Sequence, residues 1–449
     1  MTRMRALALA GFAAVVSGCA RSVQAPAPTP ADIPALEAAR QQRPNDASVL
    51  TRLGIAYFDA KDYTKARDAL RATLVVEPTS YAAAVYLGLS YEELGNLDSA
   101  RVSYNRAAGM RITSGQREEL TARLTLLTRK ELQQDARNAL AQEAVLTQSA
   151  PVENTIAVFP FRYRGANEEL RPLERGLSQL IVTDLSKVAR LRLLERERVQ
   201  ALLDEMQLTD SGRVQSATGA RSGRMLRAAS VVQGTLQDQP GNGSQLRLDA
   251  NVINATNASV TASGAATDRL QQLFEVEKTV VLQLLQKMGI TLSAAERRAI
   301  SERPTADLQA FLAYSRGLEA EDRGDFQAAA DQFNAAVARD PNFRTAKDKQ
   351  AQNQRMAAAM GTTPAQLAGI QGGVPTGADR PQQPGTPTPR VITLRNVITG
   401  SVPSHGGLIT GQVGGQPPLQ RPPLPEAIQT DDPRTGGLTG QIIIIITRP

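Results

Sequence analysis

A pattern of small and large residues recurs after 34 positions near the start of the chain. The small members suit a close crossing of two helices, and the large members fill the space beside it. A period of this length predicts stacked pairs of antiparallel helices, because one pair alone cannot bury its apolar face. Pro78 ends the second helix of the first pair, and Pro44 ends an earlier helix over 35–42. The matched sets are Gly54, Tyr57, Ala66 and Leu70, then Gly88, Tyr91, Ala100 and Tyr104.

The same offsets return far along the chain, with Ala320 where the earlier sets have tyrosine. This period and this alternation of small and aromatic residues resemble tetratricopeptide repeats. The resemblance covers residues 35–112 and one further repeat at 305–349. It implies a short solenoid whose first helices line a concave groove. The returning set consists of Gly317, Ala329, Phe333, Ala336 and Pro341.

By the offsets of these repeats, six residues line the groove, and several are apolar. Such a surface suits an amphipathic or extended peptide of a protein partner. The same residues could instead pack against the chain's own next helix, which helical spacing of leucines predicts over 116–146. Both interpretations remain open at this point; that helix belongs to a linker at 113–150. The six residues are Thr51, Ile55, Phe58, Val85, Leu89 and Glu92.

The first 18 residues predict a secretory signal peptide. Arg3 and Arg5 precede an apolar stretch over 6–16 that is too short to span a bilayer. The following residues, ending in the single cysteine Cys19, resemble a bacterial lipobox. The resemblance implies that Cys19 becomes the acylated first residue; an ordinary signal peptide with an incidental cysteine is the alternative. Ala20, where aspartate would favour the inner membrane, indicates the periplasmic face of the outer membrane. A proline-rich tether completes 19–34.

The middle of the chain alternates between strand and helix patterns. A continuous apolar run over 155–161 predicts a buried strand. The complete order is βαβααβββα, an α/β unit at 154–292. The other predicted strands cover 191–196, 230–236, 245–252 and 258–265, and the helices cover 168–188, 197–206, 215–228 and 270–288.

This order and several of its sequences resemble the CsgG family of outer-membrane lipoprotein domains and, more loosely, the amino-terminal domain of TolB. The family includes a pore-forming secretion protein and non-pore periplasmic lipoproteins that assist envelope machines. Its pore members carry long membrane-spanning hairpins, whereas the hairpin at 230–260 is polar. The resemblance is carried by 156–161, Gly176-Leu177, 183–185, 193–198, Leu202-Leu203 and 228–234.

Composition argues against enzyme and metal chemistry. One histidine (His405) and one cysteine nearly exclude a Cys/His zinc site, a disulfide and a Ser-His-Asp triad. The net charge of +7, from 51 basic and 44 acidic residues, is too dilute to indicate nucleic acid. The charged run 195–198 is interpreted as a solvated helix start. A second basic run, Arg213, Arg221, Arg224 and Arg227, is interpreted as a solvated face. The sequence thus predicts no catalytic residue, no cofactor and no metal.

A Pro- and Gly-rich tail is predicted over 350–449, where the sequence cannot bury enough apolar surface to fold alone. It contains β-prone segments at 391–398, 408–413 and 442–447. These could add a strand to a sheet edge of this chain or of a partner, or belong to a spacer.

The sequence therefore predicts a multidomain α and α/β protein: helical repeats, a CsgG-like domain, a further repeat and a tail. We expect a non-enzymatic adaptor or assembly factor, lipid-anchored at the outer membrane, that binds envelope proteins through its repeats and no nucleic acid. The alternative is a component of an oligomeric secretion channel, so a homo-oligomer is possible.

Overall fold

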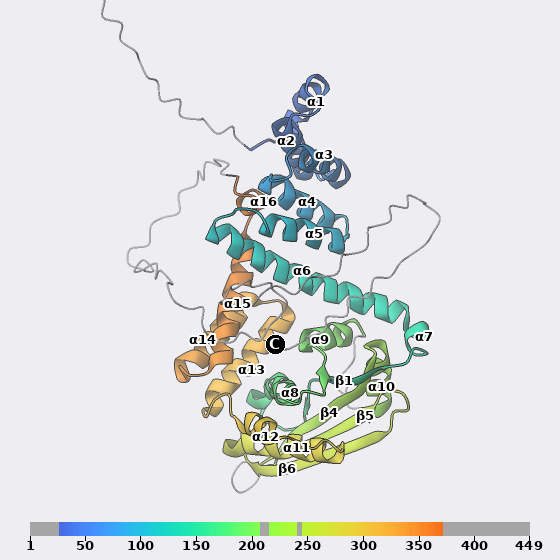
Figure 1. Cartoon of the computed structure of the whole chain (residues 1–449). Coiled ribbons are helices and arrows are strands. Elements are labelled where there is room, and N and C mark those ends of the chain that lie inside the picture. Colours follow the sequence, from blue (N-terminus) through green and yellow to red (C-terminus); the bar gives the residue numbers. More distant parts are fainter. Residues whose placement is uncertain (1–26, 207–214, 240–244, 371–449) are drawn as a thin grey trace, which may run out of the picture. The chain divides into compact units, whose positions relative to one another are not determined.

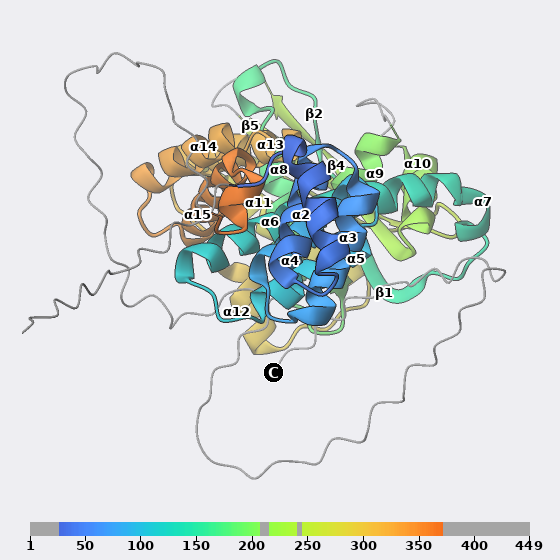
Figure 2. The ribbon, with the colours of Figure 1, turned by 90° about the horizontal axis from the view of Figure 1, so that it is seen from above.

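The computed structural model describes residues 27–206, 215–239 and 245–370. Within these ranges helices form both ends and a sheet lies between them in sequence (Figure 1). The repeat helices α2 to α5 pack side by side in chain order (Figure 2). After the short turn η1 (Pro30–Asp32), the helices are α1 (Ile33–Gln42), α2 (Ala47–Asp59), α3 (Tyr63–Val76), α4 (Tyr81–Glu93) and α5 (Leu97–Ala108).

The periodic glycines explain how each pair of helices closes. A Cβ atom on Gly54 would lie 2.6 Å from Leu70 Cγ, and one on Gly88 would lie 2.5 Å from the Tyr104 ring. In both pairs the glycine therefore stands where the large side chain of the second helix crosses the first. The structure confirms the prediction that the small and large positions of the period meet where the two helices of a pair cross.

The two helices of the returning repeat also cross at a glycine. It consists of α13 (Leu308–Arg323) and α14 (Phe326–Arg339), and a Cβ on Gly317 would lie 2.5 Å from the Phe333 ring. Its connecting turn also matches, since Gly324 has a φ of 80° at the place where Gly95 has a φ of 73°. A positive φ is accessible to glycine without a steric penalty, so this turn favours glycine.

A long helix, α6 (Ser114–Ala141), follows the first repeats and confirms the predicted linker helix. It begins with a capping box in which Thr113 and Gln116 bond each other's backbone amides. It contacts α5 near its start and α9 further on. A short helix, α7 (Glu143–Leu146), continues from it, and Glu143 forms an ion pair with Arg221 of α10 at 2.6 Å.

One mixed sheet forms the core of the middle region, with the strand order β3-β1-β4-β5-β6 and β2 paired to β4. β1 runs parallel to both β3 and β4, with Ile156 opposite Leu193 and Ser230. β4, β5 and β6 are antiparallel. The predicted order is confirmed, with β2 added. The strands are β1 (Val152–Val158), β2 (Arg162–Tyr163), β3 (Arg192–Leu193), β4 (Ala228–Gln239), β5 (Gln245–Asn254) and β6 (Val260–Arg269).

The two faces of the sheet belong to different apolar cores, because successive residues of a strand point to opposite faces. Ile156 and Val158 face the core shared with α8 and α11, whereas Ala157 and Phe159 face the core shared with α9 and α10. The helices, with two short 3₁₀ turns, are η2 (Glu168–Leu170), α8 (Leu173–Leu185), α9 (Arg196–Glu205), α10 (Ser216–Met225), η4 (Leu270–Gln272), α11 (Leu273–Lys287) and α12 (Ala294–Ser301).

The returning repeat joins the first of these cores. Gly176 of α8 lets α13 approach closely, since a Cβ there would lie 2.0 Å from Ser315 Oγ. Phe311 of α13 contacts Phe274 of α11 edge to face, with 5.1 Å between ring centres. The single repeat thus packs on the α/β unit and shares its apolar core.

The predicted start of the tail at 350 was wrong. α15 (Arg344–Gly361) continues past this point, and α16 (Pro364–Leu367) follows. Residues 350–360 contain neither proline nor glycine and are rich in alanine and glutamine, so they favour a helix. The signal peptide, Cys19 and the three β-prone segments lie outside the described residues, as does His405.

Candidate functional site

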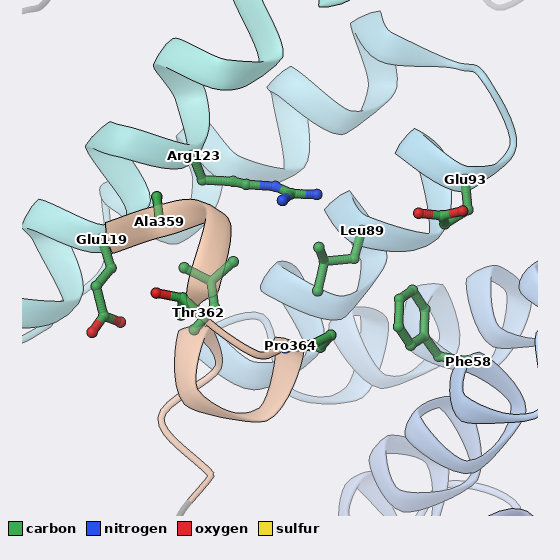
Figure 3. A pocket seen from close by; sticks show the side chains of 9 residues that line it. Phe58, Leu89, Glu93, Glu119, Arg123, Ala359, Thr362 and Pro364 are labelled. Carbon is green, nitrogen blue, oxygen red and sulfur yellow. The ribbon is translucent and has the colours of Figure 1, made fainter. Parts of the chain in front are cut away.

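The first helices of the repeats, together with α6, present side chains to one pocket of about 110 Å³ (Figure 3). Phe58 of α2 lies on one side, and Leu89 and Glu93 of α4 lie beside it. Glu119 and Arg123 come from α6. This is the side of the repeats that the sequence predicted for the groove.

The remaining wall comes from the far end of the described chain. Ala359, Thr362, Pro364 and Leu367 line the same pocket, and Figure 3 shows Pro364 facing the side of Phe58 and Leu89. The Tyr81 hydroxyl donates a hydrogen bond to the Leu367 carbonyl at 3.1 Å. The chain therefore places its own segment in the predicted groove.

Phe58 is held by aromatic contacts that leave part of its ring at the pocket. Its ring centre lies 5.3 Å from that of Tyr86, edge to face, and 5.4 Å from that of Tyr63. Such geometry is favourable for aromatic pairs. Phe58 and Leu89 are thus the apolar residues that the repeat helices contribute to the pocket.

The other predicted groove residues lie elsewhere. Ile55 and Val85 are fully buried among the repeat helices. The Thr51 hydroxyl donates to the Ala47 carbonyl at 2.7 Å, within its own helix. These three residues support the helices behind the pocket and do not line it.

The Glu92 side chain is bound by other residues of the same chain. Its carboxylate accepts hydrogen bonds from Tyr104 Oη at 2.6 Å, Arg123 Nε at 2.8 Å and Lys130 Nζ at 2.8 Å. Burial by itself raises the pKa of Glu92, but the charge of Arg123 and the hydrogen bonds from Lys130 and Tyr104 outweigh it and hold the pKa below its usual value. Of the two interpretations of this residue, packing against the chain's next helix is the one the structure supports.

Sequence reasoning missed the contributions of α6 and of residues 359–367. Arg123, Glu119 and Pro364 carry no repeat signature, and the contact between Tyr81 and Leu367 joins residues far apart in sequence. The leucine spacing of α6 predicted a packing helix, and this was the only sequence signal for the α6 side of the pocket.

A second, more open depression lies on the side of α3 and α5. Its lining mixes apolar and charged residues, among them Val75, Val102, Arg71 and Asp98. Val75 is 82% exposed and Val102 is 69% exposed. This surface serves as a comparison for the pocket at Phe58, because it lies on the second helices of the same repeats.

The charged run 195–198 is not the solvated helix start that the sequence suggested. Arg196 is buried and binds the Asp322 carboxylate of α13. Lys349 of α15 binds Glu321 at 2.8 Å and Glu197 at 3.4 Å. The returning repeat covers the start of α9, and this long-range packing is what the local sequence could not reveal.

The basic run on α10 also has partners within the chain. Arg221 pairs with Glu143, and Arg224 Nη1 donates to the Ala255 carbonyl at 2.8 Å. Arg213 lies outside the described residues. In the described ranges, no cluster of three His, Cys, Asp or Glu side chains is arranged to hold a metal ion. None of the described helices combines the length and the apolar character needed to cross a membrane.

Two family models match the chain in separate regions. Residues 137–239 match the family described as curli production assembly/transport component CsgG. Residues 33–80 and 51–115 match a tetratricopeptide repeat. No curated protein matches the chain.

Several solved structures are similar to parts of the chain. Lipoprotein GNA1162 from Neisseria meningitidis is 17% identical, with 26% of this chain and 80% of that chain covered and a TM-score of 0.22. The LpoB C-terminal domain from Salmonella enterica is 10% identical, with 28% and 95% covered and a TM-score of 0.22. A tetratricopeptide repeat protein from Parabacteroides merdae is 14% identical, with 72% and 91% covered and a TM-score of 0.20. From the two family matches, the chain combines tetratricopeptide repeats with a region similar to CsgG.

Proposed function

We propose that this chain is a non-enzymatic, lipid-anchored adaptor at the periplasmic face of the outer membrane. Its repeats bind a peptide of an envelope protein, and its CsgG-like region docks on the machine that the adaptor serves. The pocket at Phe58 carries this proposal, because it lies on the first helices of the repeats and presents apolar surface beside charged groups. The match to tetratricopeptide repeats supports a protein-binding role, and the match to CsgG supports an envelope role.

Site-specific photo-crosslinking in cells tests this proposal. A photoreactive amino acid replaces Phe58 in one strain and Val75 in another, in the full chain. Position 75 is the matched control, since its side chain is exposed on the other side of the same repeats. We expect a defined crosslinked envelope protein from position 58 and not from position 75. Equal crosslinking from both positions, or none from position 58, would refute binding at the pocket.

A second candidate, a component of a secretion channel, is favoured by the match to a family of curli assembly and transport components. The native mass of the full-length lipidated protein in detergent separates the two candidates. A closed ring of many subunits would favour the channel. A monomer or small oligomer that carries the protein crosslinked at position 58 would favour the adaptor.

A further inference from the structure

The pocket at Phe58 contains part of this chain. Residues 362–370, here called the occupant segment, leave the end of α15, form α16 and end beside the repeat helices. Leu367 and Ala368 are buried in the apolar cluster of the repeats, and Ile370 packs against it. An apolar side chain from a short helical turn is the kind of group that a groove between helices accepts.

The occupant segment is held by the packing of a few apolar side chains and by one hydrogen bond to the repeats. α16 has only four residues, and its capping box between Thr363 and Gln366 is internal to the segment. One side chain-to-backbone hydrogen bond, from Tyr81 to Leu367, joins it to the repeats. A pocket of about 110 Å³ remains between Pro364 and the side chains of Phe58 and Leu89. The segment thus occupies the groove without filling it.

Two acidic residues of the pocket lack a cationic partner in the described part of the chain. Glu93 and Glu119 line the pocket and form no ion pair with a described residue, and Arg123, the basic residue of the pocket, pairs with Glu92. In Figure 3 Glu93 lies near Phe58, and Glu119 lies near Thr362 at the other end. The occupant segment has the sequence TTPAQLAGI and brings no charge to either carboxylate. A ligand with basic residues would add interactions that the occupant segment cannot make.

We propose that the occupant segment is an intramolecular ligand of the groove, and that a short basic amphipathic helix displaces it. This inference rests on the proposed function and names the partner chemistry of the same site. The partner places apolar residues where Leu367 and Pro364 lie and basic residues at Glu93 and Glu119. Its apparent affinity is reduced by the fraction of chains in which the segment is docked.

The test uses the full chain and one fluorescent peptide, residues 359–370 with two lysines added at each end. Leu367→Asp undocks the occupant segment, because a carboxylate replaces a buried apolar anchor. Met360→Asp is the matched control, since Met360 is 64% exposed and lies close by in sequence. We expect the peptide to bind Leu367→Asp at least about ten-fold more tightly than wild type or Met360→Asp. Adding Glu93→Gln and Glu119→Gln to Leu367→Asp should remove most of this gain.

The outcomes separate the two proposals. Equal affinity for wild type and Leu367→Asp would overturn displacement and leave peptide binding by the groove intact. No binding to either chain would overturn the groove as a peptide site as well. Binding that survives Phe58→Ala in the Leu367→Asp chain would place the peptide elsewhere. If Leu367→Asp does not fold, Leu367→Ala replaces it and should tighten binding by about ten-fold, since it shortens the buried anchor of the segment and leaves the groove and the peptide unchanged.

Discussion

Lys278 neutralises a buried acidic site inside the CsgG-like region. Its ammonium group on α11 binds the Asp184 carboxylate of α8 and lies 3.3 Å from Glu277 Oε2. All three side chains are less than a tenth exposed. Burial and then the charge of Asp184 raise the pKa of Glu277 well above its usual value. Burial also raises the pKa of Asp184, although Lys278 opposes this.

Replacing Lys278 by methionine should destabilise the fold by about 3–5 kcal/mol at pH 7, because it leaves two carboxyl groups buried without a cation. The packing loss is small, since methionine keeps most of the volume of the side chain. Removing Glu277 instead should have the opposite effect. Glu277→Gln should be neutral or stabilising at pH 7, because the remaining Asp184 and Lys278 form a balanced pair.

The loss in Lys278→Met should depend on pH. A carboxyl group whose pKa is raised by folding binds more protons in the folded chain than in the unfolded chain. Its contribution to stability is therefore largest below the unfolded pKa of about 4 and is lost as the pH rises towards the folded pKa. Each extra bound proton is worth about 1.4 kcal/mol per pH unit. Lys278 lowers the pKa of both carboxyl groups, so Lys278→Met raises them further and the variant binds more protons than the wild type between pH 5 and pH 7. The cost of Lys278→Met should therefore be smaller at pH 5 than at pH 7 by at least about 1.4 kcal/mol.

Urea unfolding of the full chain at pH 5 and pH 7, followed by circular dichroism, measures these differences. Lys347→Met is the matched control, since Lys347 is exposed, and it should change stability by less than about 0.5 kcal/mol at either pH. Equal losses at pH 5 and pH 7 would refute the protonation argument. A loss below about 1 kcal/mol at pH 7 would show that Lys278 does not compensate the buried carboxylates.

Two further predictions concern the repeats and the anchor. Gly88→Ala should destabilise the α4–α5 pair by about 1–2 kcal/mol, because overpacking against the Tyr104 ring exceeds the gain in helix propensity. Faster hydrogen exchange in α4 and α5 would show this loss. Gly115→Ala is the control and should not destabilise its helix, since a Cβ there meets no atom within 4 Å. Cys19→Ala should leave the chain unprocessed or released from the membrane, since acyl chains anchor by burying methylenes; unchanged flotation with membranes would contradict lipidation.

Local patterns predicted most of the architecture because its packing follows sequence period. The glycine at each helix crossing and the large residue 16 positions later recur at Gly54, Gly88 and Gly317, and the structure pairs each as expected. The α/β order was also predictable, since continuous apolar strands and amphipathic helices differ in length and period. β2 was missed because two residues carry no period.

The pocket was only partly predictable, because its walls come from distant parts of the chain. Phe58 and Leu89, which the repeat offsets proposed for the groove, line the pocket. They also selected Glu92, whose partners Arg123 and Lys130 arrive from the next helix. The local sequence around Glu92 shows its charged side chain but not the distant cations that pair with it in the folded chain. The same reason explains Arg196, whose partner Asp322 lies in the returning repeat.

The helix after the returning repeat, α15, contacts both the pocket and the CsgG-like region. α15 carries Lys349, which binds Glu197 at the start of α9, and Ala359, which lines the pocket. These residues are about 15 Å apart along one helix. Residues 362–370 follow directly on the last turn of α15, and Lys349 near the start of the same helix binds the start of α9. If displacement of residues 362–370 shifts α15 and with it α9, then a protein that docks on α9 should change the affinity of the groove to the same extent, because coupling between two sites is reciprocal. The helix α15, which follows the single repeat, is thus the element that contacts both regions.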